Sequence, residues 1–281
     1  MIPQRNLSLL SNELARKGGR RIPEAVLERD YCLSWFLVGL SQSSLREILL
    51  FKGGTAIKKC YIADYRFSED LDFTFAKEVP FEMIQEGLGE VFRKIEQQSG
   101  IKFHFSRLDR HTHQNSHTFF LAYEGPLPAI TPKEVKVDIT IRERVVFSMR
   151  EKPVLAGYAQ YEDIPKNSKV LVYSLEEIAA EKVVALSDRA RNEPRDLYDL
   201  WHLTSNQYVD VEKILDAISE KLAFRGRSLE TVKEEFLRKE VRLKTLWSDR
   251  LSAQVAMLPE FGQVYRAVKR ELRQAGFLKR E

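Results

Sequence analysis

The sequence predicts an α+β protein that has a mixed α/β lobe over residues 1–165 and a helical lobe over residues 166–281. In the first lobe, short runs of alternating apolar and polar residues lie between helical stretches, whereas from Ser174 onward the apolar residues recur at helical spacing. Hydrophobic residues make up 43% of the chain and charged residues 31%, which excludes a mostly disordered protein. A length of 281 residues is enough for about two domains.

The first lobe combines helices with strands. Apolar residues at helical spacing predict helices over 23–41 and 81–98, and alternation predicts strands over 66–75, 101–108, 118–123 and 135–141. A short apolar run over 47–51 is read as a helix or strand that enters a tight turn at Gly53-Gly54. Residues 1–21 carry five basic side chains against one acid, which fits either a solvated helix end or an arm that contacts nucleic acid.

The second lobe is predicted to consist of helices. Ser174 and Glu177 have the spacing of a capping box, so a helix is expected to begin at Leu175 and to run to about Arg191. Pro194, a residue that suits a first helical turn, opens the next helix. Further amphipathic helices are expected over 210–222, 228–246 and 260–275.

Composition narrows the environment and the partners. No stretch approaches ~18 consecutive apolar residues, so no membrane span is expected, and the N-terminus lacks the pattern of a secretory signal. Two cysteines cannot form a disulfide framework or a zinc site by themselves, so a reducing cytoplasm is the expected compartment. The net charge of +4 permits a polyanionic partner. His111, His113 and His117 are read as a polar hairpin loop, because no nearby acid or cysteine completes a metal site.

The strongest chemical pattern is a glycine turn followed by paired carboxylates. Gly53, Gly54 and Thr55 precede a strand that carries Ser68-x-Asp70-x-Asp72. Alternate residues of a strand share a face, so Asp70 and Asp72 are expected to project together, and two such carboxylates repel unless a cation lies between them. A glycine pair lets the backbone approach a phosphate closely.

A third acid completes the predicted metal centre. Asp138 lies on the strand over 135–141, on the face opposite to its apolar residues. Carboxylate oxygens are ligands that Mg²⁺ prefers, so Asp70, Asp72 and Asp138 are predicted to hold two Mg²⁺ ions, or Mn²⁺ in their place. The alternative for the Asp70–Asp72 pair is a solvated strand face.

A lysine in an apolar segment marks the second candidate cluster. Lys182 is surrounded in sequence by alanine, valine and leucine, and a lysine there needs an anion or an exit to water. Lys182 and Arg189 could both face a triphosphate. Arg195 and Asp199 are four residues apart, so an intrahelical salt bridge is the alternative to a functional role for Arg195.

Two motifs resemble those of a known family. GGTAIKKCYIADYRFSEDLDF, residues 53–73, resembles the signature of the AbiEii/AbiGii nucleotidyltransferase toxin family, which includes the MenT toxins and belongs to the polymerase-β-like nucleotidyltransferase superfamily. EEIAAEKVVALSDRARNEPRDLYDLWHL, residues 176–203, resembles a further motif of that family. The resemblance implies a polymerase-β-like lobe with a mixed sheet, followed by a helical C-terminal lobe.

The resemblance also implies roles for single residues. The catalytic set implied is Asp70, Asp72, Asp138 and Lys182. The nucleotide-binding set implied is Lys52, Gly53, Gly54, Thr55, Arg66, Ser68, Arg189, Arg195, Asp196 and Asp199. Thr55 stands where many superfamily members have serine, and it keeps the hydroxyl group.

The activity implied is transfer of a nucleoside monophosphate from an NTP to an RNA acceptor, the tRNA 3′ end, with two-metal catalysis. The chain would be the toxin of a toxin–antitoxin or abortive-infection system that acts in phage defence, with a cognate antitoxin as partner and no membrane association. Three alternatives stay open: a nucleotidyltransferase that modifies a protein hydroxyl or a small molecule, a non-catalytic GTP-binding protein, and a structural partner of an RNA-processing complex.

Overall fold

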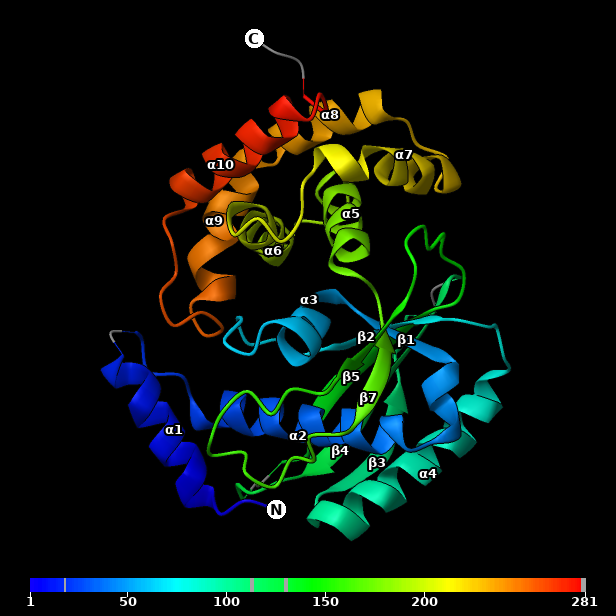
Figure 1. Ribbon diagram of the computed structural model, residues 1–281, viewed down its shortest axis with the longest axis vertical. Coiled ribbons are helices and arrows are strands. Elements are labelled where there is room, and N and C mark those ends of the chain that lie inside the picture. The colour runs from blue at the N-terminus through cyan, green and yellow to red at the C-terminus, as the bar shows by residue number, and fades with distance from the viewer. Residues whose placement is uncertain (18, 112–113, 129–130, 279–281) are drawn as a thin grey trace. The chain divides into compact units, whose positions relative to one another are not determined.

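The computed structural model describes residues 1–17, 19–111, 114–128 and 131–278 (Figure 1). The chain divides into two compact units. The first comprises Met1–Glu143 and Met149–Val172, and the second comprises Arg144–Ser148 and Tyr173–Glu281. The boundary that the sequence suggests, at residue 165, falls before the last strand of the first unit. Each unit is described by itself.

A mixed sheet forms the centre of the first unit. Within the described residues it has seven strands in the order β3-β4-β5-β2-β1-β7-β6. The β2–β5 and β1–β7 pairs are parallel and the other pairs are antiparallel. The strands are β1 Leu49–Lys52, β2 Leu71–Phe75, β3 Lys102–Leu108, β4 Ser116–Glu124, β5 Lys133–Thr140, β6 Arg150–Pro153 and β7 Lys169–Val172.

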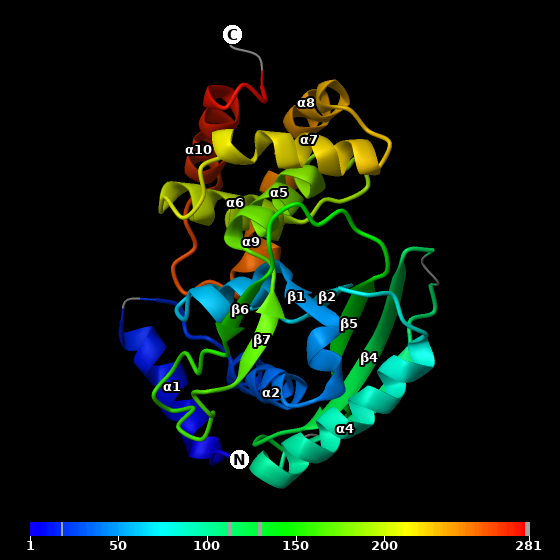
Figure 2. The same cartoon turned by 45° about the vertical axis from the view of Figure 1, so that its right-hand side comes forward.

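Helices pack against this sheet. They are α1 Gln4–Arg16, α2 Glu24–Ser41, the 3₁₀ turn η1 Ser44–Glu47, α3 Gly53–Ala56, the π-helical turn η2 Ile57–Tyr61 and α4 Phe81–Ser99. Helix α2 contacts β7 and lies beside α4, which contacts β3 (Figures 1 and 2). Nearly every side chain of α2 from Leu27 to Leu40 is buried, because neighbours surround it. Gly39 permits the close approach of α4, since a Cβ there would lie 2.6 Å from Ile95 Cγ1.

Most predicted elements of the first unit are confirmed, with two exceptions. The strand predicted over 66–75 begins only at Leu71. The carbonyl of Asp70 instead accepts a hydrogen bond from Thr55 Oγ1 at 2.6 Å. The hairpin loop predicted around His117 is also wrong at that residue, because His117 belongs to β4 and packs against Phe81. Residue 113 lies outside the described residues. Strands β6 and β7 have no counterpart among the predicted elements.

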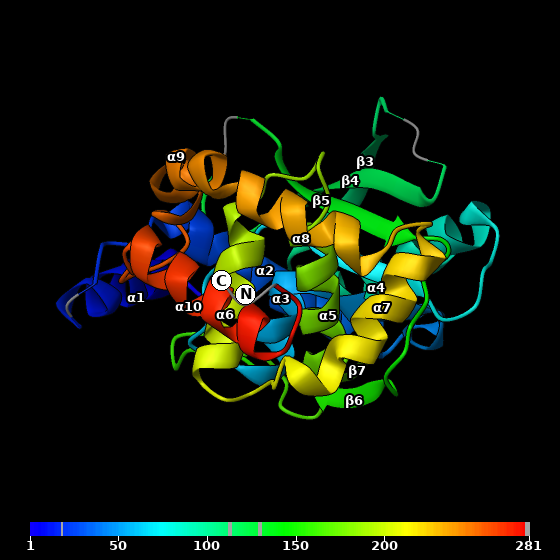
Figure 3. The same cartoon turned by 90° about the horizontal axis from the view of Figure 1, so that it is seen from above.

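Helices make up the second unit. They are α5 Leu175–Leu186, α6 Pro194–Ser205, the 3₁₀ turn η3 Glu212–Ile214, α7 Leu215–Phe224, α8 Leu229–Arg238, α9 Glu240–Leu251 and α10 Phe261–Gln274. Helices α5 and α6 contact each other and together contact α7, α8, α9 and α10 (Figure 3). Stacked aromatic rings, such as Phe236 on Tyr265 with centroids 5.3 Å apart, fill the space between the outer helices.

The predicted starts of α5 and α6 are confirmed, since Ser174 accepts a hydrogen bond from the Glu177 amide and Pro194 opens α6. Three predicted lengths are wrong. The helix predicted over 210–222 is the 3₁₀ turn η3 followed by α7, which begins at Leu215 and ends at Phe224. Helix α5 ends at Leu186, and the single helix predicted over 228–246 is two helices that meet at Lys239. Lys239, at the junction of α8 and α9, is buried, and its ammonium donates to carbonyls at the end of α5 and beyond it.

The Glu177 side chain does not complete the capping box. Its carboxylate accepts hydrogen bonds from the amides of Val146 and Phe147, at 3.0 and 2.9 Å, and pairs with Lys221 Nζ at 2.5 Å. Glu177 therefore binds the segment Arg144–Ser148 to the helices of the second unit.

In the part of the chain that the structure describes, no helix has the length and apolarity needed to cross a bilayer.

Candidate active site

The predicted site residues fall into two groups, one in each unit. In the first unit, four side chains form a row across neighbouring strands. The register pairs Lys52 with Asp72, Asp72 with Asp138, and Asp138 with Thr118. Side chains of register partners stand on the same face of a sheet, so β1, β2, β5 and β4 present one cation, two carboxylates and one hydroxyl side by side.

Hydrogen bonds orient the members of this row. Asp138 Oδ2 accepts from Thr118 Oγ1 at 3.1 Å and lies 3.8 Å from Lys136 Nζ. Lys52 Nζ donates to Thr140 Oγ1 at 3.0 Å. Thr118 is not among the predicted site residues, and its only signal in the sequence is its place in an alternating strand. That Thr118 lies beside Asp138 follows only from the register of β4 on β5.

The glycine turn lies directly against this row. Gly53 has φ of +78°, a conformation that favours glycine, and begins α3 right after β1. A Cβ at Gly53 would lie 2.7 Å from Asp72 Oδ2, so bare backbone is required beside the carboxylate. Asp70 precedes β2 and is held through its backbone carbonyl by Thr55. The turn therefore positions both acids of the DxD motif.

The donor set fits a hard divalent cation in its chemistry. Asp72 and Asp138 are register partners and Asp70 lies two residues upstream, all of them partly exposed. Carboxylate oxygens are the ligands that Mg²⁺ takes in phosphoryl-transfer sites. The described side chains form no preassembled group of three His, Cys, Asp or Glu residues around a metal position, so the fit rests on the chemistry of these donors.

Two more predicted nucleotide ligands lie in the loop before Asp70. Arg66 and Ser68 are both buried there, with exposed fractions of 4% and 7%. A guanidinium nitrogen of Arg66 donates to the Phe67 carbonyl at 3.1 Å, so this side chain supports its own loop.

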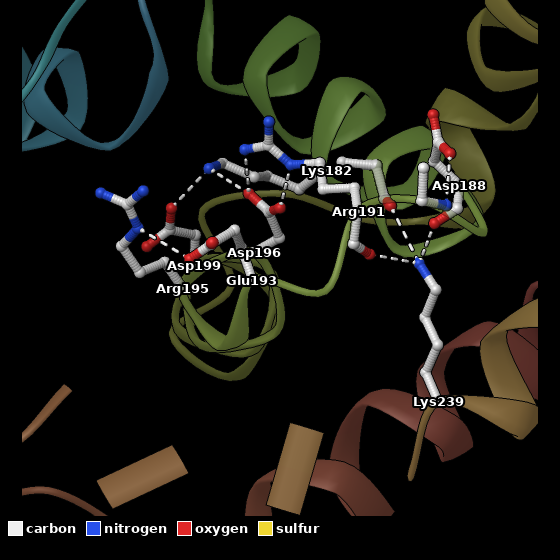
Figure 4. A network of polar contacts seen from close by, with 10 residues as sticks. Lys182, Asp188, Arg191, Glu193, Arg195, Asp196, Asp199 and Lys239 are labelled. Carbon is white, nitrogen blue, oxygen red and sulfur yellow. Dashed lines mark hydrogen bonds and ion pairs between the residues drawn. The ribbon is translucent and has the colours of Figure 1, made fainter. Parts of the chain in front are cut away.

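In the second unit, Lys182 has two buried carboxylates as partners. Its Nζ lies 2.8 Å from Asp196 Oδ1 and 2.7 Å from Asp199 Oδ2 (Figure 4). The predicted need for an anion is thus met by two acids of α6. Asp196 is also bound by Arg191, whose Nε and Nη2 donate to its two oxygens at 2.6 and 3.2 Å. Burial alone would raise the pKa of Asp196, but Lys182 and Arg191 offset this and hold the pKa well below its usual range.

The other predicted residues of this group lie near its edge. Arg189 is exposed and lies in the connection between α5 and α6, because α5 ends too early to carry it on a helical face. Arg195 Nε lies 3.6 Å from Glu193 Oε2 (Figure 4). Arg191 was not predicted as a site residue. Its place in the connection between α5 and α6 follows from the end of α5 at Leu186, and the sequence did not reveal that helix end.

Residues 35–269 match the family described as "Nucleotidyl transferase AbiEii toxin, Type IV TA system". The chain belongs to this family. The resemblance inferred from the two motifs is therefore confirmed, and the protein is a nucleotidyltransferase toxin of a type IV toxin–antitoxin system. Such a toxin takes an NTP as substrate and has a cognate antitoxin.

The fold of this chain is also similar to that of a solved structure. MenT4, a nucleotidyltransferase toxin from Mycobacterium tuberculosis H37Rv, superposes with a TM-score of 0.60 at 17% sequence identity, over 96% of this chain and 89% of that chain. At this identity the comparison supports the α+β fold alone. Comparison with curated protein sequences finds no match.

A buried lysine organises the loop that leads to Asp70 in the toxin. Lys58 Nζ donates to the carbonyls of Ala63 and Tyr65, both at 3.0 Å, and to Tyr158 Oη at 3.1 Å. It also lies 4.3 Å from the centroid of the Phe67 ring. Lys58 was not predicted as a functional residue, although Lys58 lies between the glycine pair and the DxD motif. Burial lowers the pKa of Lys58 to about 8.

This lowered pKa predicts a dependence of stability on pH. Below pH 8 the folded and unfolded toxin both carry the proton on Lys58, and the burial cost is present in full. Between about pH 8 and the ordinary lysine value of 10.5, the unfolded chain binds the proton more tightly, so stability rises with pH by about 1.4 kcal/mol per unit. Measured by urea unfolding, the free energy of unfolding of the wild type minus that of Lys58→Met should rise with pH over this interval. A difference that stays constant with pH contradicts the assignment.

The glycine turn gives a second prediction. Gly53→Ala is expected to lower transferase activity by about 10²-fold, because the added Cβ displaces the Asp72 carboxylate and misplaces the reacting groups. The measurement is the initial rate of labelled-NMP transfer. The matched control is Gly89→Ala in α4, where an added Cβ meets nothing within 4 Å. Equal activity of the two variants would show that Gly53 does not support the site.

Proposed function

We propose that the toxin transfers a nucleoside monophosphate from an NTP to an RNA acceptor, the 3′ end of a tRNA. The acceptor hydroxyl oxygen forms the new bond to the α-phosphorus, the bond to the bridging oxygen breaks, and pyrophosphate leaves. The observation that supports this proposal best is the row of Lys52, Asp72 and Asp138 beside the bare backbone of Gly53. Phosphoryl transfer depends mainly on positioning and charge stabilisation, which such a row supplies.

The roles of the first unit follow from the chemistry of its side chains. Asp70, Asp72 and Asp138 would hold Mg²⁺, which when bound neutralises phosphate charge and lowers the pKa of an acceptor hydroxyl. Asp138 accepts the proton of that hydroxyl as it attacks. Thr118 donates to Asp138 and thereby keeps its carboxylate oriented. Gly53 and Gly54 let the triphosphate approach the backbone.

The second unit contributes the cation of the family's further motif. Lys182 binds the triphosphate and stabilises its charge, with Arg189 and Arg195 as additional cationic ligands. Asp196 and Asp199 hold the Lys182 ammonium in place through their ion pairs. These roles rest on the resemblance of residues 176–203 to a motif of the family.

A basic helix face supports RNA as the acceptor. Arg266, Lys269, Arg270 and Arg273 lie on one side of α10 and line a shallow groove of about 560 Å³ together with Gln274. Four cations over two helical turns match a repeating phosphate backbone better than a single small anion.

Because NTPs and RNA occur together in the cytoplasm, we place the reaction there.

Incubation of the purified toxin with each labelled NTP, Mg²⁺ and total bacterial RNA tests the proposal. Label at tRNA size is the expected result, and parallel reactions with cell protein and with small molecules distinguish the other acceptors. Label that enters protein alone would replace the RNA acceptor by a protein hydroxyl. Bound GTP without any transfer would indicate a nucleotide-binding protein.

The α10 face is tested by the salt dependence of RNA binding. Arg266→Gln combined with Arg270→Gln should reduce the slope of log K against log salt by about 0.7 to 0.9 for each RNA phosphate that these side chains neutralise in the wild type. Lys213→Gln combined with Arg238→Gln makes the same change in charge at exposed positions on other elements, and its slope should equal that of the wild type. Equal slopes for both double variants would remove α10 from the RNA site.

A further inference from the structure

Lys239 interrupts what would otherwise be one long helix. It lies alone between α8 and α9, with φ of −82° and ψ of −10°, and is 5% exposed. Its Nζ donates to the carbonyl oxygens of Asp188, of Arg191 at 2.6 Å and of Ala185 at 3.4 Å (Figure 4). All three acceptors belong to the end of α5 and the segment that joins it to α6.

This contact adds a charged donor to carbonyls at the end of α5 and just beyond it, where the Ala185 and Asp188 carbonyls each already accept one backbone amide at 3.1 Å. Carbonyls near a helix C-terminus carry partial negative charge and can accept more than one hydrogen bond, so a lysine ammonium is a favourable partner there. Burial lowers the pKa of Lys239, while the nearby Asp188 counteracts this shift. Asp188 is in turn held by Arg227 at 3.2 Å. The connection between α5 and α6 is therefore folded around one buried cation.

Arg191 links this connection to the predicted triphosphate ligand. Its carbonyl accepts from Lys239, and its guanidinium binds both oxygens of Asp196. Asp196 uses the oxygen Oδ1 for Lys182 as well. The contacts therefore run without a gap from Lys239 through Arg191 and Asp196 to Lys182 (Figure 4).

We propose that Lys239 and Arg191 are positioning residues that fix the place of the Lys182 ammonium. Lys239 holds the Arg191 backbone, Arg191 holds the Asp196 carboxylate in one orientation, and Asp196 holds Lys182. The inference rests on the proposed function, because it takes Lys182 as the ligand of the triphosphate. Loss of either positioning residue frees Asp196 to rotate with Lys182, so the affinity for the NTP falls although neither residue touches it.

Two variants and two controls test this inference. Lys239→Met keeps the side-chain length and removes the donors, and Arg191→Gln removes the guanidinium from a side chain that is 49% exposed. Each is expected to raise KM for the NTP and the equilibrium Kd for a non-hydrolysable NTP by about tenfold, as removal of a residue that supports a ligand-binding group does. KM for RNA should stay unchanged, and Lys239→Arg should restore part of the affinity.

The first control is Arg238→Met, which makes the same change in charge one residue away, at an exposed side chain that pairs with Glu234 and Glu235 of its own helix. It should bind the NTP as the wild type does. The second control is the double variant Lys239→Met/Arg191→Gln. Because both residues act through Asp196, its loss of affinity should be close to that of one single variant rather than their product.

The outcomes separate this inference from the proposed function. A merely structural role for Lys239 would lower kcat through loss of folded protein and leave KM and Kd for the NTP unchanged, which overturns the inference. If Lys239→Met does not fold, Arg191→Gln carries the test alone, and wild-type affinity in that variant overturns the inference. If the wild-type toxin binds NTP but transfers the nucleoside monophosphate to no acceptor, only the proposed function is overturned. If it binds no NTP, the proposed function and this inference are both overturned.

Discussion

Asp72→Asn is expected to lower nucleotidyl transfer by about 10²- to 10³-fold, the loss typical of removing one preorganised charged group from a reaction site. Asp72 stands between Lys52 and Asp138 in the register row and lies against Gly53. Asparagine has the same shape, so it leaves the turn intact and removes only the charge. Two neighbouring carboxylates repel each other, so the substitution should not reduce the free energy of unfolding.

The measurement is the initial rate of transfer together with thermal unfolding of the same preparation. Asp249→Asn, at an exposed position of α9, makes the same change in charge and should keep full activity. Excess chelator should abolish the wild-type rate, and added Mg²⁺ or Mn²⁺ should restore it. An active Asp72→Asn variant would remove the carboxylate row from the mechanism, and full activity in chelator would remove the metal.

Lys221→Met is expected to destabilise the second unit by about 3–5 kcal/mol, the cost of leaving a buried charge without its partner. Lys221 and Glu177 are both fully buried, and their Nζ–Oε1 distance is 2.5 Å. Lys221 also donates to the carbonyl of Arg144 at 2.7 Å. The substitution therefore removes the ion pair of the Glu177 carboxylate and the hydrogen bond that the Arg144 carbonyl accepts.

Hydrogen exchange gives the most local measurement of this effect. The amides of Val146 and Phe147 donate to Glu177, so their protection should fall together with the midpoint of urea unfolding. Adding Glu177→Gln to Lys221→Met should recover part of the stability, because it removes the unpaired charge. Lys213→Met, at a lysine that is 80% exposed, should change stability by about 0.5 kcal/mol or less. Unchanged protection in Lys221→Met would contradict the buried pair.

Local patterns were sufficient for most elements and for the family. The alternation of Val135, Val137 and Ile139 correctly predicted β5, and its burial pattern has these residues inside. Pro194 correctly marked the start of α6. These signals predict structure well because periodicity and capping involve residues that are close together in the sequence. The two motifs were distinctive enough to indicate the family that the match over residues 35–269 then confirmed.

Helix ends were less predictable, because partners distant in sequence set them. No residue between Leu186 and Arg191 is a strong helix breaker, so the sequence favours a longer α5. The bonds of Lys239 to the carbonyls of Asp188 and Arg191 stabilise a different path. The same lysine divides the helix that was expected over 228–246.

The sequence alone was thus sufficient to predict which residues the candidate site contains, because it indicated acids on strand faces and a lysine in an apolar helix. Tertiary structure alone decided which of them are neighbours. The parallel pairing of β2 with β5 sets Asp72 beside Asp138, and the packing of α6 on α5 supplies Lys182 with two carboxylates. The physical reason is that a buried charge requires a partner, whereas the choice among available partners depends on strand register and helix contacts that no local pattern encodes.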